Sequence, residues 1–300
     1  MKVLVCAGDG IGNTIQATPC IAALRTLPQV ERVDLYTFMA PPGVEEYFKV
    51  KGMTVDVSRD PRRFAGRNYD LIIIGFVSGA PRAGAKRVIK CKSPIKARMQ
   101  ESETYFPIVR ELGYTGPIPP TWLKRPSGGP VRGARVVCIG GGGKQTPVPW
   151  GPLRRYHRYQ EVVDLLAKWY DDEITFTVVG KDDDTLVKGH GVWDFRGGDF
   201  REAVDTIYGS TVYMGNDCGL THVAAALGVP TIDILGATQW RRSVPPRNVI
   251  ALNVQGLACQ PCQVLGKVDC EHECMANLDP RMVAAAASAV ITGVEREYAS

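Results

Sequence analysis

Short apolar runs alternate along this chain with longer segments in which apolar residues recur at helical spacing. In the first half, the runs predict strands over residues 2–7, 33–38, 54–57 and 71–77, and the spacing predicts helices over 13–27 and 43–51. Strands that alternate with helices favour a parallel, doubly wound sheet. The first half is therefore expected to form a Rossmann-like α/β domain.

This periodicity stops between residues 116 and 130, where Pro and Gly are frequent, and then begins again. The second half predicts strands over 134–139, 174–179, 211–214 and 231–235, and helices over 159–170, 200–208, 220–227 and from Pro280 onward. We predict an α/β fold of two Rossmann-like domains, 1–127 and 128–300, with parallel sheets facing across a cleft. The Pro/Gly segment is the predicted linker.

Composition agrees with two ordinary domains. A chain of 300 residues with 45% hydrophobic content can bury about two cores. The longest apolar run, 71–77, is far too short to cross a bilayer, and residues 1–5 begin a strand rather than a signal peptide. We expect a cytoplasmic protein.

Positive charge is concentrated in the first domain. Residues 1–127 contain 19 Lys and Arg against 11 Asp and Glu, whereas residues 128–300 contain 17 against 20. The excess includes Arg59, Arg62, Arg63 and Arg67, and then Lys86, Arg87, Lys90, Lys92, Lys96 and Arg98. These side chains either form a solvated loop face or bind an anionic partner, which could be a phosphorylated glycan, a nucleic acid or a membrane surface.

The segment 214–222, Met-Gly-Asn-Asp-Cys-Gly-Leu-Thr-His, predicts a turn between a strand and a short helix. At the carboxyl edge of a parallel sheet, such a turn directs helix N–H groups and the positive end of the helix dipole at an anion. Asp217 would then lie at a seat for a diphosphate. The simpler interpretation is that Asp217 only caps the helix, while Gly215 and Gly219 satisfy the turn geometry.

Each half also opens with a Gly-rich turn directly after its first strand, at residues 8–13 and 140–143. Neither turn fits Gly-x-Gly-x-x-Gly, and the sequence contains no P-loop Gly-Lys-Ser/Thr. A dehydrogenase or a P-loop ATPase is therefore disfavoured. Glycines at these turns still allow a sugar or a phosphate to approach the backbone closely.

Nine cysteines are many for a cytosolic chain, and four of them are closely spaced: Cys259, Cys262, Cys270 and Cys274. Thiolates at such spacing suit a structural zinc site. Free thiols are an equally good interpretation. Disulfides are less favoured because a reducing compartment keeps thiols reduced.

Four segments, taken together and in order, extend over nearly the whole chain: Gly-Ile-Gly-Asn-Thr-Ile-Gln-Ala-Thr-Pro (10–19), Gly-Asn-Asp-Cys-Gly-Leu-Thr-His (215–222), Ala-Ala-Ala-Leu-Gly-Val-Pro (224–230) and Leu-Gly-Ala-Thr (235–238). This combination resembles the ADP-heptose:lipopolysaccharide heptosyltransferases, glycosyltransferase family 9. The resemblance implies a GT-B fold with an N-terminal acceptor domain and a C-terminal domain for a nucleotide-diphosphate sugar. It also implies inverting transfer without a catalytic metal or other cofactor.

The resemblance further implies roles for individual residues. The family's donor-phosphate motif falls on Asp217, Gly219, Leu220, Thr221 and His222, and the turn after the next strand falls on Thr238, where Ala237 replaces the usual proline. A family Lys that neutralises donor phosphate has its nearest matches in Arg154 and Arg155, with Lys144 as a further choice. Gly12 is expected at the donor. Asp182 either binds ribose hydroxyls or belongs to a solvated turn.

The chain departs from the family at Asn13, where heptosyltransferases carry the Asp that acts as general base. An amide cannot accept that proton, so a base worth about 10²–10⁴-fold in rate would have to lie elsewhere. Asp9 in the same turn is the nearest candidate. Otherwise Asn13 only orients the acceptor and another base acts, or the protein binds without catalysing.

We therefore predict an inverting glycosyltransferase with ADP-heptose as the default donor. The default acceptor is an anionic, lipopolysaccharide-type saccharide at the basic N-terminal domain, with peripheral contact at the inner face of the membrane. The alternatives are a nucleic-acid-modifying glycosyltransferase and a catalytically inert nucleotide-sugar binder. A nucleotide-sugar epimerase or dehydrogenase ranks last because the dinucleotide fingerprint is missing.

Overall fold

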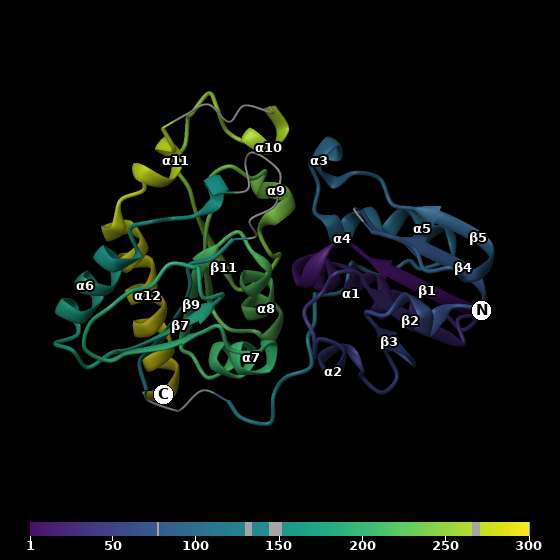
Figure 1. Ribbon diagram of the computed structural model, residues 1–300, viewed down its shortest axis with the longest axis horizontal. Coiled ribbons are helices and arrows are strands. Elements are labelled where there is room, and N and C mark those ends of the chain that lie inside the picture. The colour runs from purple at the N-terminus through teal and green to yellow at the C-terminus, as the bar shows by residue number, and fades with distance from the viewer. Residues whose placement is uncertain (77, 130–133, 144–151, 266–270, 300) are drawn as a thin grey trace. The chain divides into compact units, whose positions relative to one another are not determined.

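The computed structural model describes residues 1–76, 78–129, 134–143, 152–265 and 271–299. The chain divides into two compact units, Met1–Arg125 and Pro126–Ser300. Figure 1 shows the first unit in purple to blue and the second in teal to yellow. Each unit is built on one parallel β-sheet.

The sheet of the first unit has five strands in the order β3-β2-β1-β4-β5. The strands are β1 (Lys2–Ala7), β2 (Arg32–Thr37), β3 (Val57–Ser58), β4 (Asn68–Ile74) and β5 (Gly84–Lys90). The helices are α1 (Gly10–Arg25), α2 (Glu45–Phe48), η1 (Pro61–Phe64), α3 (Pro94–Ala97), α4 (Glu101–Thr104) and α5 (Phe106–Glu111). Since β2 and β4 flank β1, the turn after β1 lies at a topological switch point, where α/β folds bind ligands.

The sheet of the second unit has six strands in the order β11-β10-β9-β6-β7-β8. The strands are β6 (Val136–Gly140), β7 (Thr175–Gly180), β8 (Val192–Arg196), β9 (Val212–Asn216), β10 (Thr231–Ile234) and β11 (Val249–Leu252). The helices are η2 (Pro152–Arg154), α6 (Tyr159–Trp169), α7 (Phe200–Tyr208), α8 (Gly219–Leu227), α9 (Trp240–Ser243), α10 (Cys262–Leu265), α11 (Glu273–Ala276) and α12 (Pro280–Ala299). In this sheet β6 and β10 flank β9, whose carboxyl end leads into α8.

Helices cover both faces of the second sheet. Side chains of α6 and α12 join Ile232 and Ile234 of β10 in the largest core cluster of this unit. The opposite face is covered by α7 and α8, which pack against each other and against the strands. Because successive strand residues point to opposite faces, Asp233 lies on the α8 face.

The predicted α/β fold of two parallel-sheet units is confirmed. The strands predicted over 2–7 and 33–38 correspond to β1 and β2, and α7 has the bounds that its spacing predicts. The helix predicted over 43–51 is limited to Glu45–Phe48. The segment around Lys86 is not a loop, as one interpretation held, but the edge strand β5.

Within the described part of the chain, none of the helices combines the length and the apolar character needed to span a membrane.

Candidate functional site

The turn between β9 and α8 brings a helix N-terminus to the carboxyl edge of the second sheet. Cys218 occupies the N-cap position but forms no side-chain cap hydrogen bond. The Thr221 hydroxyl donates to the backbone oxygen of Asn216 and closes the turn from within. Asp217 is 7% exposed and lies just ahead of the helix. The N-terminal turn of α8 therefore lacks the side-chain acceptor that would ordinarily cap it.

Of the two candidate arginines, only Arg154 contacts this turn. Its Nη1 donates to the backbone oxygen of Asp217 at 3.3 Å and lies 3.9 Å from Asp217 Oδ2. Arg155 instead forms a 3.0 Å ion pair with the carboxylate of Asp184, which is largely buried. Arg154 is therefore the cation next to Asp217, while Arg155 holds the loop after β7. Lys144 lies outside the described residues.

Asn216, which is not among the residues predicted from the sequence, organises the site. It is completely buried, and its Nδ2 donates to the backbone oxygens of Gly141 and Gly142, both at 3.0 Å. Its Oδ1 accepts from the Tyr156 backbone N–H at 3.0 Å and from the Tyr159 hydroxyl at 2.9 Å. One amide therefore fixes the Gly-rich turn after β6 and the segment that carries Arg154 to the end of β9. Its place immediately before Asp217 was the available sequence signal.

Thr238 lies in the turn that follows β10 and is 4% exposed. Within the described residues its hydroxyl has no hydrogen-bond partner. Two hydrogen bonds from the segment before and within α10 fix this turn. Gln260 Nε2 donates to the backbone oxygen of Gly236 at 3.0 Å, and the Gln263 N–H donates to the backbone oxygen of Ala237 at 3.0 Å. The Thr238 hydroxyl is thus a positioned polar group that a ligand could engage.

His222 is buried on α8 and is held neutral. Burial lowers its pKa to about 4, and the charge of Arg242 acts in the same direction, while Asp217 opposes the shift. At neutral pH the imidazole is therefore not a cation. Gly219 and Leu220 precede it in the first turn of α8.

The acidic residues that follow β7 have different environments. Asp182 is exposed, and its carboxylate lies against Gly197, where an added Cβ would be 2.0 Å from Oδ1. Asp184 is the buried acid: it pairs with Arg155 and accepts from the Lys181 N–H at 2.8 Å.

Two of the four clustered cysteines border the turn of Thr238. Cys262 packs with Leu153 and Ala237, and an added Cβ on Gly236 would be 3.0 Å from the Cys274 Sγ. Cys259 is half-buried, and Cys270 lies outside the described residues. Among the described residues no group of three His, Cys, Asp or Glu side chains is arranged to hold a metal ion.

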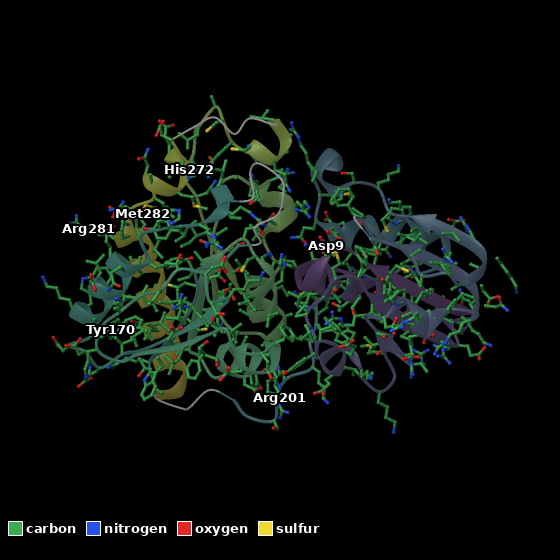
Figure 2. All side chains as sticks on the ribbon, viewed as in Figure 1. Asp9, Tyr170, Arg201, His272, Arg281 and Met282 are labelled. Atoms are coloured by element: carbon green, nitrogen blue, oxygen red, sulfur yellow. The ribbon has the colours of Figure 1, made fainter. Side chains whose placement is uncertain are left out.

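The first unit has its own polar turn, after β1. Asp9, labelled in Figure 2, occupies the N-cap position of α1. Asn13 Nδ2 donates to the backbone oxygen of Asp9 at 2.9 Å, so the amide fastens the turn. Gly12 lies in the first turn of α1. Glu101, which no sequence pattern marks, is a completely buried carboxyl that packs against Gly8, where an added Cβ would be 2.7 Å from Oε1.

Half of the first group of arginines, Arg63 and Arg67, is structural. Asp34, with 0% exposure, accepts from Arg32, Arg67 and the Tyr69 hydroxyl. Arg67 also pairs with Asp56 at 2.7 Å, and Arg63 pairs with Asp56 at 3.1 Å. The other two contribute little to this network, because Arg62 pairs with its exposed neighbour Asp60 and the backbone N–H of Arg59 donates to Glu45.

Comparison with known proteins supports the resemblance that the sequence motifs indicate. Residues 198–272, which contain the Asp217 turn and Thr238, match the model of glycosyltransferase family 9 (heptosyltransferase). The resemblance to glycosyltransferase family 9 is confirmed. No curated protein matches the chain in sequence.

Solved structures with this fold cover almost the entire chain. ADP-heptose lps heptosyltransferase II of E. coli gives a TM-score of 0.72 at 16% identity, over 98% of this chain and 100% of that one. A family 9 glycosyltransferase of Veillonella parvula gives 0.73 at 14% identity, over 97% of each chain. The iron-containing dodecameric glycosyltransferase TibC of enterotoxigenic E. coli gives 0.61 at 15% identity, over 99% of this chain and 77% of that one. The shared fold is of the GT-B type, and together with the family 9 match it indicates a glycosyltransferase.

Proposed function

We propose that this chain transfers a sugar from a nucleoside-diphosphate donor to a saccharide acceptor, with inversion and without a catalytic metal. The observation that carries the proposal is the Asp217 turn, where Arg154 contacts the residue just ahead of the α8 N-terminus, beside the strand β10 that leads to the buried Thr238 hydroxyl. Backbone N–H groups, a helix dipole and a guanidinium are the groups that stabilise a departing diphosphate. Gly219, Leu220, Thr221 and His222 complete this proposed donor motif.

ADP-heptose is the proposed donor, because the family 9 match covers the donor turn and the similar E. coli enzyme is an ADP-heptose heptosyltransferase. Asp182 remains the candidate for the ribose hydroxyls. Arg155 and Gly12 are proposed to act indirectly, by shaping the two Gly-rich turns.

The acceptor is proposed to be an anionic, lipopolysaccharide-type saccharide held by the first unit in the cytoplasm. Lys90 ends β5 beside Ile74 of β4, which in turn pairs with Cys6 of β1, so Lys90 and the Asp9 turn share one sheet edge. Lys90, Lys92 and Arg98 form no ion pair with any residue that the structure describes. Their charge suits a phosphorylated glycan or the anionic surface of a membrane.

Asp9 is proposed as the general base that takes the proton of the acceptor hydroxyl. It is the carboxylate of the turn, whereas the Asn13 amide is engaged with the Asp9 backbone. Replacing Asp9 by Asn should lower kcat about 10²–10⁴-fold and leave nucleotide affinity unchanged, because the base acts only on the acceptor. If Asp9→Asn keeps full activity, the buried Glu101 becomes the next carboxyl to replace.

The donor site is tested by calorimetry with ADP and other nucleoside diphosphates on the wild type, Arg154→Ala and Arg155→Ala. We expect Arg154→Ala to weaken ADP binding about tenfold or more, since it loses a charge-assisted contact to phosphate. Arg155→Ala is the matched control: because Arg155 acts only through the loop that it holds, its loss should weaken ADP binding less than the loss of Arg154. If the wild type binds no nucleoside diphosphate, the donor proposal fails.

The cysteine cluster is proposed to hold a structural metal. Zinc fits thiolates at this spacing, and the iron of TibC makes iron the alternative. Elemental analysis of the purified protein, compared with Cys262→Ser, distinguishes zinc, iron and free thiols.

Binding and transfer assays on the same protein distinguish the two alternative functions. A nucleic-acid-modifying transferase should bind nucleic acid with a steep salt dependence. A catalytically inert binder should bind ADP-heptose but transfer nothing to any acceptor.

A further inference from the structure

Asp233 is an unusual residue for the middle of a strand. It lies in β10 with 0% exposure, and neither carboxyl oxygen has a hydrogen-bond partner within the described residues. Burying an ionised carboxylate without hydrogen-bond partners costs much free energy, so such a group usually stays protonated instead. By contrast, the buried Asp34 accepts four side-chain contacts from Arg32, Arg67 and Tyr69.

The position of Asp233 connects it to the donor turn. In the sheet register Asp233 is opposite Gly215 of β9, and Asp217 follows two residues later. Asp233 points to the face that α8 covers, as deduced above from the core positions of Ile232 and Ile234. Gly215 contributes no side chain, and the space above it is taken by the Tyr213 hydroxyl.

Among the described residues, no cation is one of the groups that shift the pKa of Asp233, although Arg242 acts on His222 of α8 and Arg154 lies beside Asp217. Tyr213 of β9 is neutral because burial raises its pKa, and burial likewise raises the pKa of the Cys218 thiol. His222 of α8 is neutral at pH 7. Tyr159 of α6, on the other side of the sheet, also has a pKa raised by burial.

Asp217 is therefore the charged group that most affects the protonation of Asp233. Burial raises the pKa of Asp233 well above its usual range, and the negative charge of Asp217 raises it further. Two neighbouring carboxyl groups that are both buried do not readily both ionise.

We propose that Asp233 holds a proton at neutral pH, so that the Asp233–Asp217 pair presents one negative charge and not two beside the diphosphate seat. The role of the pair at a diphosphate rests on the proposed function, whereas the proton on Asp233 does not. The proton comes from solvent as the chain folds. Its effect is electrostatic, because a second carboxylate would repel an incoming diphosphate. Asp233 is thus a positioning residue that sets the charge of the donor site.

The test compares the wild type with Asp233→Asn, which is neutral and nearly the same shape. Urea unfolding of the ligand-free proteins is measured from pH 5 to 8. The folded wild type keeps a proton that its unfolded chain releases above about pH 4, so its stability falls with rising pH relative to the variant. The unfolding equilibrium constant of the wild type should rise about tenfold per pH unit relative to Asp233→Asn.

Asp184→Asn is the matched control in the same unit, since Asp184 is a buried carboxyl with partners in Arg155 and Lys181. It should destabilise the protein at pH 7, whereas Asp233→Asn should not. The carbonyl band of a protonated carboxyl should also be present in the infrared difference between wild type and Asp233→Asn. Parallel pH profiles, absence of that band, or failure of Asp233→Asn to fold would each overturn the proposal.

Nucleotide binding then tests the consequence. ADP should bind Asp233→Asn within about threefold of the wild type at pH 7, since both side chains are neutral. A gain of about tenfold or more in affinity would mean that Asp233 is ionised in the wild type. If neither protein binds ADP, the proposed function fails while the unfolding data still decide the state of Asp233.

Discussion

At the scale of single residues, some side chains of the donor turn could be predicted from the sequence and others could not. Asp217 and Thr238 follow predicted strands and could be selected from their places in turns. Asn216 and Asp233 could not, because their roles depend on contacts across the sheet: Asn216 holds the turn after β6, and Asp233 faces the end of β9. The choice between Arg154 and Arg155 likewise needed the position of Asp184.

His222 should make the second unit sensitive to acid. Its folded pKa of about 4 lies below the usual value of about 6.5, so between these values the unfolded chain binds a proton that the folded chain does not. Stability is then fully present above about pH 6.5 and is lost as the pH falls toward 4. Between pH 7 and 4.5 the wild type should lose about 2 kcal/mol more than His222→Gln in urea unfolding.

The control for this experiment is His190→Gln, at an exposed position. It should follow the wild-type profile across the whole range. Equal acid loss in the wild type and His222→Gln would show that His222 is not held neutral by the fold.

At the scale of elements, periodicity predicted the buried strands and missed three of the four edge strands. β5, β8 and β11 lie at sheet edges, and their side chains are largely exposed or half-buried, so no apolar run marks them. The start of α1 was placed three residues late, because Gly10 and Gly12 are poor helix formers that here begin the helix at a tight turn.

The turn between β1 and α1 should not tolerate a side chain at Gly8. An added Cβ would lie 2.5 Å from the Phe76 backbone oxygen and 2.9 Å from the Asn13 Cβ. Gly8→Ala should therefore shift the turn and cost about 1–3 kcal/mol in denaturant unfolding. Gly79→Ala is the matched control, because its nearest neighbour would be the Phe38 ring at 3.4 Å. Equal stability of the two variants would mean that the first turn can relax.

At the scale of the whole molecule, two units with separate cores should give two thermal unfolding transitions. The sheets and cores of Met1–Arg125 and Pro126–Ser300 are each complete within their unit. The proposed nucleotide site belongs entirely to the second unit, so ADP at 100 times its Kd should stabilise that unit by about 2.7 kcal/mol.

Differential scanning calorimetry should show this as an upward shift of one transition, with the other unmoved. Arg154→Ala should abolish the shift at the same ADP concentration. A single transition that moves as a whole would show instead that the two units unfold together.

The exposed edge strand β5 has a consequence for how copies of this protein behave at high concentration. An open parallel edge offers unpaired backbone groups to the strand of another molecule, which is a route to aggregation. Lys86, Arg87 and Lys90 stand along that edge, where they would repel the same strand of a second copy. The basic character of this segment thus serves solubility as well as any acceptor, and acetylation of Lys86 and Lys90, which removes two of its three positive charges, should make the protein prone to precipitate.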